Sequence, residues 1–320
     1  MTAPSRSHRE IWDGCIVNDE IDLLVERLRY LSPVVDRFVV VEANRTFAGS
    51  EKPLYVQAAL GRELADYRDQ IVHVVADLPA KADSTWQREI AQRDALYDSL
   101  RQQAPADAIV TVCDVDEIPT TSALTEAARA YAGPRTLAMH HAVLFANWHL
   151  NGVWRRAFLA TPEDVKAAAE SLAQPGGRLP DALPGGWHLS FLGGRDMIRS
   201  KLGAYSHQEF NTKRMTRDSF LRECFVVGMI PTTRQLLTPR EPADAGDLVE
   251  GLVSTRSDYL GPAVLPPRYR RRAFRAWAGV RTRRWVPDWF VAWVDARPRL
   301  AYWVGYVWLV PVELLQPARD

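Results

Sequence analysis

Residues 108–119 read AIVTVCDVDEIP, an apolar run that leads directly into three carboxylates. The run from Ala108 to Cys113 is apolar or β-prone throughout, which favours a buried strand. Pro119 cannot donate a ladder hydrogen bond, so it keeps the strand from continuing as a central element of a sheet. The sequence therefore predicts a buried strand over residues 108–113 that delivers acidic side chains to the rim of a sheet.

Asp114 and Asp116 are the first candidates for chemistry. In an extended segment the side chains alternate, so these two carboxylates would point to the same side. Carboxylates this close repel one another unless a metal ion, a proton or a cationic partner compensates them. Mg²⁺ or Mn²⁺ held by one or two carboxylates, with substrate phosphates in other positions, is the usual arrangement. The alternative is a solvated acidic turn after the strand, and the third acid, Glu117, favours the metal site.

Apolar runs and helical periodicity alternate on both sides of this stretch. Before residue 120 the chain shows four β elements with helices between them, which is typical of parallel strands joined by helical crossovers. We therefore expect an α/β fold with a mainly parallel sheet and a ligand crevice at the carboxyl ends of its strands. The expected strands cover residues 11–17, 36–42, 70–75, 108–113, 136–145 and 186–191, and the expected helices cover residues 22–31, 84–100 and 196–205.

The bulk properties exclude several classes of partner. Lys plus Arg (40) nearly balance Asp plus Glu (39) over 320 residues, so no overall field favours nucleic acid. The three cysteines, Cys15, Cys113 and Cys224, are widely spaced, and we expect neither a disulfide framework nor a zinc site. Residues 1–10 are polar and lack the apolar segment of a secretory signal. These features predict a cytoplasmic protein.

The C-terminal part of the chain has a different composition. A linker at residues 261–267 precedes the strongly basic stretch 268–284, and six of the eleven tryptophans fall between Trp277 and Trp308. Residues 300–312 carry no charge. This run is too short for an ordinary membrane-spanning helix but fits an interfacial one.

This change in composition predicts two domains, residues 1–260 and 261–320. Arginine and tryptophan at such density favour peripheral contact with an anionic inner-membrane face through residues 268–312. The alternative is a helical C-terminal appendage that packs its aromatic side chains on the core.

Polar side chains elsewhere are candidates to complete a site. His207 stands two residues before Glu209, and a neutral imidazole there could complete the coordination of Mn²⁺, although a lone histidine is more often structural. Arg88 and Arg93 lie in the helix expected over residues 84–100. They either face the rim of the sheet or form salt bridges on an exposed helix face.

Several polar and aromatic blocks follow one another along about residues 11–235. They are DEIDLL (19–24), DRFVVVEANRTF (36–47), KPL (52–54), the segment 86–94, DVDEIP (114–119), GWH (186–188) and SHQEFN (206–211). Taken together and in this order, they resemble glycosyltransferase family 17. Order and spacing make the resemblance more specific than any single motif.

The resemblance implies a GT-A-like fold, which is a Rossmann-like, mainly parallel sheet with helices on both faces. It also implies a UDP-sugar donor and a divalent metal ion, Mn²⁺ or Mg²⁺. In that arrangement Asp114 and Asp116 hold the metal against the donor diphosphate, and His207 is the candidate third protein ligand. The other candidate donor contacts are Arg88, Arg93 and Lys201 for the phosphates, and Glu42 and Asn44 for the nucleoside.

Members of this family are treated as inverting, which requires a carboxylate base for the acceptor hydroxyl. Glu209 is the first candidate, Glu117 is the second, and Asp181 on a glycine- and proline-rich loop is the third. Trp187, with His188 beside it, is the candidate contact for an acceptor sugar ring. Alternatively, Trp187 is a core tryptophan.

The leading prediction is a metal-dependent, inverting glycosyltransferase that moves a sugar, N-acetylglucosamine, from a UDP-sugar to a hydroxyl. Animal members carry an N-terminal membrane anchor that this sequence does not show, which favours a lipid-linked, polysaccharide or small-molecule acceptor over a Golgi glycan. Two alternatives stay open. One is a nucleotidyltransferase or phosphohydrolase that uses the same acids, and the other is a non-catalytic, membrane-associated carbohydrate-binding module.

Overall fold

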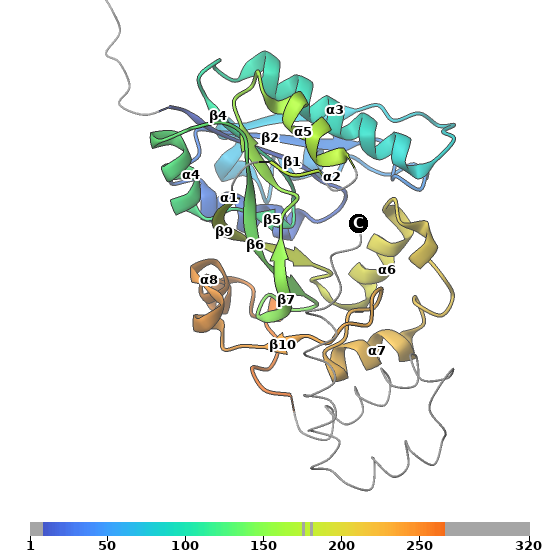
Figure 1. The fold of residues 1–320 in the computed structure, drawn as a ribbon. Coiled ribbons are helices and arrows are strands. Elements are labelled where there is room, and N and C mark those ends of the chain that lie inside the picture. Colours follow the sequence, from blue (N-terminus) through green and yellow to red (C-terminus); the bar gives the residue numbers. More distant parts are fainter. Residues whose placement is uncertain (1–8, 175–176, 180–181, 266–320) are drawn as a thin grey trace, which may run out of the picture.

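The computed structural model describes residues 9–174, 177–179 and 182–265 (Figure 1). In this part of the chain, ten strands form one sheet in the order β10-β7-β6-β8-β4-β1-β2-β3, with β9 beside β6 and β5 beside β9. The strands are β1 (Ile11–Ile16), β2 (Arg37–Ala43), β3 (Ile71–Ala76), β4 (Ile109–Asp114), β5 (Glu117–Ile118), β6 (Arg135–Val143), β7 (Trp148–Trp154), β8 (Phe158–Ala160), β9 (Ala182–Ser190) and β10 (Thr238–Pro239).

Helices and short 3-10 turns connect these strands. The helices are α1 (Ile21–Leu31), α2 (Tyr55–Ala59), α3 (Thr85–Gln103), α4 (Thr121–Arg129), α5 (Val165–Ala173), α6 (Gly194–Ala204), α7 (Asp218–Val227) and α8 (Asp247–Thr255). The 3-10 turns are η1 (Ala65–Gln70), η2 (Gln208–Phe210), η3 (Pro242–Ala245) and η4 (Ser257–Tyr259).

The first half of the sheet is parallel, as the sequence predicts. β1 pairs with β2 and with β4, and β2 pairs with β3, all in the same direction. All six residues of β1 are buried, which is typical of a parallel strand covered on both faces by helices. The carboxyl ends of β1, β2 and β4 therefore bring Asn18, Asn44 and Asp114 to one edge of the sheet.

The second half of the sheet departs from the prediction of a mainly parallel sheet. β8 runs antiparallel to both β4 and β6, and β7 runs antiparallel to β6 and β10, whereas β9 lies parallel to β6. Residues 144–147 are the whole connection between β6 and β7. A connection this short allows a hairpin but not the crossover of a parallel pair. The fold is thus mixed α/β, consistent with a Rossmann-like arrangement.

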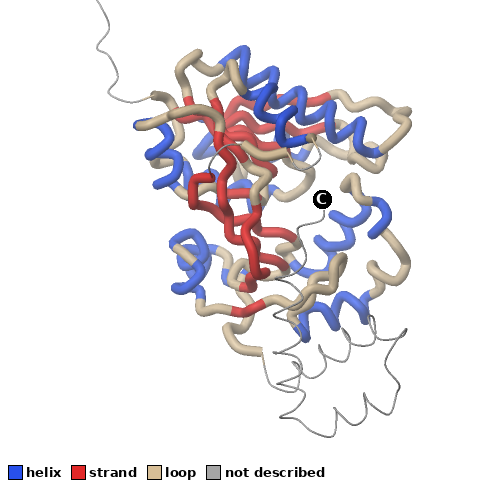
Figure 2. The backbone as a smooth tube through the Cα atoms, in the orientation of Figure 1, coloured by secondary structure: helices blue, strands red, loops and turns tan. Residues whose placement is uncertain are grey.

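Helices cover both faces of the sheet (Figures 1 and 2). Along β2, Phe38 and Val40 belong to a buried cluster with α1, α4 and α8, whereas Val39 and Val41 belong to a cluster with α3 and α5. Successive side chains of a strand point to opposite faces, so the two clusters lie on opposite sides of the sheet. The predicted cover of both faces is confirmed.

A third buried cluster fixes α6 and α7. Ile198 and Leu202 of α6 and Leu221 of α7 pack there with Val143 and Trp148, which flank the connection between β6 and β7. α6 is also tied to the end of β1, because the Ser200 hydroxyl donates to Asp19 (2.6 Å). This packing holds α6 beside the carboxyl ends of the parallel strands.

Several predictions for the C-terminal part fall outside what the structure describes. The basic and tryptophan-rich residues 268–312, with their predicted membrane contact, lie outside the described residues, and the domain boundary at residue 260 stays a prediction. Within the described ranges, every helix is too short or too polar to cross a membrane.

Candidate functional site

The three acids of residues 114–117, here called the acid turn, end β4 and begin β5. Asp114 is the last residue of β4, Val115 and Asp116 form a turn, and Glu117 starts β5. The strand predicted over residues 108–113 is observed as β4, but the same-side placement expected of Asp114 and Asp116 in an extended segment does not apply, because the strand ends at Asp114. Asp116 and Glu117 are buried, whereas Asp114 is partly exposed. Each carboxylate consequently meets its own set of partners.

A buried ion pair holds the backbone of the acid turn. Arg27 of α1 and Asp13 of β1 are fully buried and joined by two contacts of 2.7 Å. Nη1 of Arg27 also donates to the backbone carbonyls of Asp114 (3.2 Å) and Glu117 (2.5 Å). The sequence-based prediction missed both residues. A charge in the middle of an apolar run, as at Asp13, is the signal that indicates such a pair.

Asp114 faces Arg93 on α3. Nη2 of Arg93 lies 2.9 Å from Asp114 Oδ1 and 3.0 Å from Glu89 Oε1. Glu89 and Arg93 stand one helical turn apart, so α3 presents both to the sheet edge. Burial alone would lower the pKa of Arg93, but the carboxylates of Asp114 and Glu89 outweigh it and raise that pKa. Arg93 therefore contacts the acid turn as well as its own helix.

Asp116 pairs with Lys201 on α6. Nζ of Lys201 lies 2.5 Å from Asp116 Oδ2 and 3.9 Å from Glu20 Oε1, and His188 Nε2 lies 3.7 Å from Asp116 Oδ1. Burial would raise the pKa of Asp116, but Lys201 and His188 lower it below its usual value. Burial would likewise lower the pKa of Lys201, but Asp116 and Glu20 raise it. The pair is therefore charged on both sides at neutral pH.

Glu117 is enclosed by donors from its own site. Its Oε2 accepts the backbone N–H of Asp114 (2.8 Å), and its Oε1 accepts the indole N–H of Trp154. Burial raises the pKa of Glu117 to about 8, and the charges of Asp114 and Asp116 add to this rise. Glu117 is therefore mostly protonated at neutral pH.

Three rings stand next to the acid turn. His188 of β9 stacks on His141 of β6 with 4.6 Å between ring centroids, and Trp154 of β7 lies 4.2 Å from His188. Burial lowers the pKa of His141 to about 4 and also lowers that of His188, so both imidazoles are neutral at pH 7. His188 Nδ1 is enclosed without a hydrogen-bond partner among the described residues.

His207 and Glu209 lie on the outer side of the site. His207 Nδ1 is 2.7 Å from Glu209 Oε1, and the two side chains are 48% and 60% exposed. The ring of Trp86 meets His207 edge-on at 4.8 Å. The neighbouring Ser206 connects this segment to α3, because its hydroxyl bonds to Glu89. His207 and Glu209 thus lie near the Glu89 end of α3.

Glu42 and Asn44 bond to the protein itself. Glu42 is fully buried and accepts the backbone N–H groups of Val56 (2.9 Å) and Gln57 (2.8 Å) at the start of α2. Asn44 bonds to the side chain of Asp77 (2.5 Å) and to the backbone N–H of Leu78. The prediction that Glu42 contacts a nucleoside conflicts with this full burial. Asn44 is partly exposed, and its donor contact stays a prediction.

Arg88 and Trp187 also turn inward. Arg88 donates to the backbone carbonyls of Pro79, Phe47 and Ala80 at 2.9–3.1 Å and is 6% exposed. Trp187 is 2% exposed and donates its indole N–H to a backbone carbonyl at 2.8 Å. Arg88 therefore holds loops in place. Of the two alternatives for Trp187, a sugar contact or a core residue, its burial supports the core residue. Asp181 lies outside the described residues.

Asp114 and Asp116 supply two carboxylates of the kind that bind a hard divalent cation. Oδ1 of Asp114 is enclosed and meets Arg93 as an ion pair, but it accepts no hydrogen bond from the residues that the structure describes. Mg²⁺ commonly takes one or two carboxylates and completes its shell with phosphate oxygens and water. Within the described ranges, no three histidine, cysteine or acidic side chains converge as a metal site. His207 as a third ligand thus stays a prediction.

Comparison with known proteins assigns the family. The model of glycosyltransferase family 17 matches residues 3–237, which is most of the chain. The Beta-1,4-mannosyl-glycoprotein 4-beta-N-acetylglucosaminyltransferases of Homo sapiens and Rattus norvegicus are each 32% identical to this chain over 123 residues. That match covers 36% of this chain and 23% of each relative. On the strength of the family match, the chain belongs to glycosyltransferase family 17, a family of glycosyltransferases.

Proposed function

We propose that this chain is a metal-dependent, inverting glycosyltransferase of GT-A-like fold. It moves N-acetylglucosamine from a UDP-sugar to a hydroxyl of a glycan, lipid-linked or small-molecule acceptor. The observation that carries this proposal is the acid turn. In a chain of family 17, Asp114 ends a parallel strand at the sheet's carboxyl edge and Asp116 follows it, and Arg93 and Lys201 each lie within 3 Å of one of these two carboxylates. Ligands of open α/β sheets bind at this edge.

The charges of the site suit a departing nucleoside diphosphate. Asp114 and Asp116 would hold Mg²⁺ or Mn²⁺, which would supply Lewis-acid neutralisation of the leaving group. Arg93 and Lys201 both keep their positive charge, and their carboxylate partners hold them in place before a substrate arrives. Such preorganised cations stabilise developing negative charge without reorganisation during the reaction. The two cations are therefore the proposed phosphate contacts.

Two glutamates are the candidates for the base that deprotonates the acceptor hydroxyl. Glu209 is more than half exposed, and its hydrogen bond with His207 lowers its pKa, so it is ionised and accessible. Glu117 is buried, and both of its oxygens already accept hydrogen bonds. A base must reach the proton that it removes. Accessibility therefore favours Glu209.

Thermal unfolding with nucleotides tests the donor assignment. Wild-type protein is measured with UDP, UDP-N-acetylglucosamine and GDP-mannose, each with and without Mn²⁺. A ligand at about 100 times its Kd stabilises the native state by about 2.7 kcal/mol. We expect this stabilisation from UDP and its sugar only when Mn²⁺ is present, and we expect Asp116→Asn to abolish it.

Asp98→Asn is the matched control, because Asp98 is also an ion-paired carboxylate, but its side chain is 47% exposed and its partner is Lys166 of α5. It should respond to nucleotides as the wild type does. Failure of folded wild-type protein to respond to any nucleotide would contradict the proposal, and so would an unchanged response in Asp116→Asn. A positive result is followed by transfer of radiolabelled N-acetylglucosamine to a mixed acceptor pool.

A further inference from the structure

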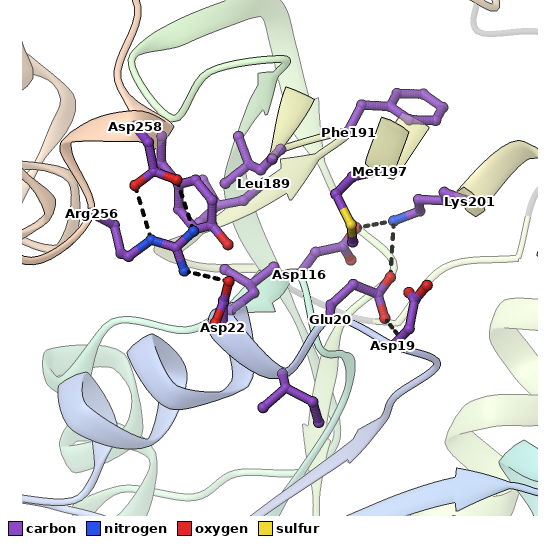
Figure 3. Close-up of a pocket in the computed structure, with 15 residues that line it drawn as sticks. Asp19, Glu20, Asp22, Asp116, Leu189, Phe191, Met197, Lys201, Arg256 and Asp258 are labelled. Atoms are coloured by element: carbon purple, nitrogen blue, oxygen red, sulfur yellow. Dashed lines mark hydrogen bonds and ion pairs between the residues drawn. The ribbon is translucent and has the colours of Figure 1, made fainter. Parts of the chain in front are cut away.

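A cavity of about 250 Å³ lies beside the pair of Asp116 and Lys201 (Figure 3). Its wall comes from the start of α1, the end of β9, α6 and the segment around η4. Asp116 and Lys201 both line it, whereas Asp114 and Arg93 are not part of its lining. A molecule in this cavity would therefore touch the inner side of the acid turn, away from the pair of Asp114 and Arg93.

The polar part of the lining is mainly acidic. Lys201 and Arg256 are its cations, and its carboxylates belong to Asp19, Glu20, Asp22, Asp116 and Asp258. Both cations are already paired. Lys201 contacts Asp116 at 2.5 Å, and Arg256 contacts Asp22 at 3.0 Å and Asp258 at 2.8 Å. At the Arg256 end of the cavity, apart from the proposed phosphate contact Lys201, an anionic group would thus meet the carboxylates of Asp22 and Asp258 and a guanidinium already paired with both.

The remaining wall is apolar. Leu189, Phe191 and Met197 lie along one side, and the ring of Tyr259 lies 3.9 Å from the Arg256 guanidinium carbon. A sugar ring has the matching character, with an apolar face and hydroxyls that donate to carboxylates. The volume is below the roughly 300–1,000 Å³ typical of sites for drug-sized ligands, which suits a single monosaccharide unit.

We propose that this cavity binds the sugar unit of the acceptor and selects an uncharged unit over one that carries a carboxylate, phosphate or sulfate. That the bound sugar belongs to an acceptor depends on the proposed transferase function. The preference for an uncharged sugar depends only on the charges of the cavity. Asp22 and Asp258 determine this specificity, because they neutralise Arg256. Both side chains are more than half exposed, at 68% and 60%, so their substitution should leave the fold intact.

Direct sugar binding tests the location. Saturation-transfer NMR is recorded with the methyl glycosides of glucose, galactose, mannose and N-acetylglucosamine, and with methyl glucuronide. At least one neutral glycoside should bind wild-type protein, and Met197→Trp, which fills the cavity, should abolish that binding. Glu126→Gln, on the exposed side of α4, is the control and should bind as the wild type does. Absence of binding by every neutral glycoside, or unchanged binding in Met197→Trp, would overturn the proposal.

The charge preference is tested by freeing Arg256. In the double variant Asp22→Asn, Asp258→Asn, the ratio of neutral-sugar affinity to glucuronide affinity should fall at least tenfold. Adding Arg256→Gln to that variant should reverse most of the change. An unchanged ratio in the double variant would refute the assigned selectivity.

Failure of the donor assignment is separable from failure of this inference. Sugar binding that depends on the cavity, in protein that binds no nucleotide, would retain the cavity and reject the transferase. A Met197→Trp variant that loses stabilisation by UDP-N-acetylglucosamine but not by UDP would show that the cavity holds the donor sugar, which would overturn the acceptor assignment.

Discussion

Asp13, Arg27 and Glu42 lie inside the fold with fully buried side chains, whereas His207 and Glu209 lie at its surface and are about half exposed. The first three, here the interior charges, each make several bonds to backbone groups or to other strands and helices. The last two, here the surface pair, bond to each other across one residue. This contrast separates charges that shape the sheet edge from charges that are free to meet a substrate.

Breaking the pair of Arg27 and Asp13 should have the largest effect on stability. Arg27→Met leaves the Asp13 carboxylate buried without its counter-charge, and removing one partner of a buried ion pair costs about 3 to 5 kcal/mol. The free energy of unfolding in urea measures this loss. Arg222→Met, which breaks an exposed ion pair with Asp218, is the control and should cost less than about 1 kcal/mol. Equal free energies of unfolding for the two variants would mean that the buried pair of Arg27 and Asp13 does not stabilise the carboxyl edge of the sheet.

Glu42 should give a smaller effect that depends on pH. Burial would raise its pKa, but the hydrogen bonds from His73 and from the N–H groups of Gln57 and Val56 lower it below the ordinary value. A carboxyl with a lowered pKa stabilises the fold above its ordinary pKa of about 4.5, and this contribution disappears as the pH falls through its value in the folded state.

Glu42→Gln should therefore destabilise the protein by about 1 to 3 kcal/mol at pH 7 and show a shallower loss of stability between pH 5 and pH 3. Urea unfolding across this pH range gives both quantities. Glu51→Gln serves as the comparison, because that side chain is 79% exposed in its ion pair with Arg45. Identical pH profiles for the wild type and Glu42→Gln would show that the carboxylate does not stabilise the start of α2.

The smallest effect on stability is expected for the surface pair. Glu209→Gln should leave the melting temperature unchanged, because the side chain is exposed and its side-chain partner is the likewise exposed His207. If Glu209 is the base, transfer should nevertheless fall by about 10² to 10⁴-fold. Melting curves and initial rates on the same preparation separate the two. A variant that keeps its kcat would rule out Glu209 as the base.

The parallel half of the fold could be predicted from sequence, because each of its strands is an apolar run with a polar residue just after it. The acid turn stood out for the same reason. Apart from the hairpin of β6 and β7, the strands from β8 to β10 pair with strands distant in sequence. No local pattern states which of these strands lie side by side, so the mixed character of the sheet was not visible.

The same lack of local information about distant neighbours explains why Glu42 and Arg88 were predicted to contact the donor, although both bond to the protein itself. Glu42 follows an apolar run as Asp114 does, but α2 begins beside Glu42, and five residues are too few to show helical periodicity. Arg88 and Arg93 are five positions apart on one helix, and only the folded structure shows that one donates to loop carbonyls and the other contacts Asp114. Side-chain type and strand ends predict the region of a site, whereas the direction of each side chain depends on elements distant in sequence.

Arg27 bonds to the carbonyl oxygens of the acid turn and to none of its side chains. Carbonyl oxygens are present whatever amino acid occupies a position, so the clamp does not depend on the identity of residues 114–117. For protein engineering, this means that the backbone of the turn is held independently of the side chains at residues 114–117. Asp13 and Arg27 should therefore keep this backbone in place when the proposed metal ligands at positions 114 and 116 are substituted.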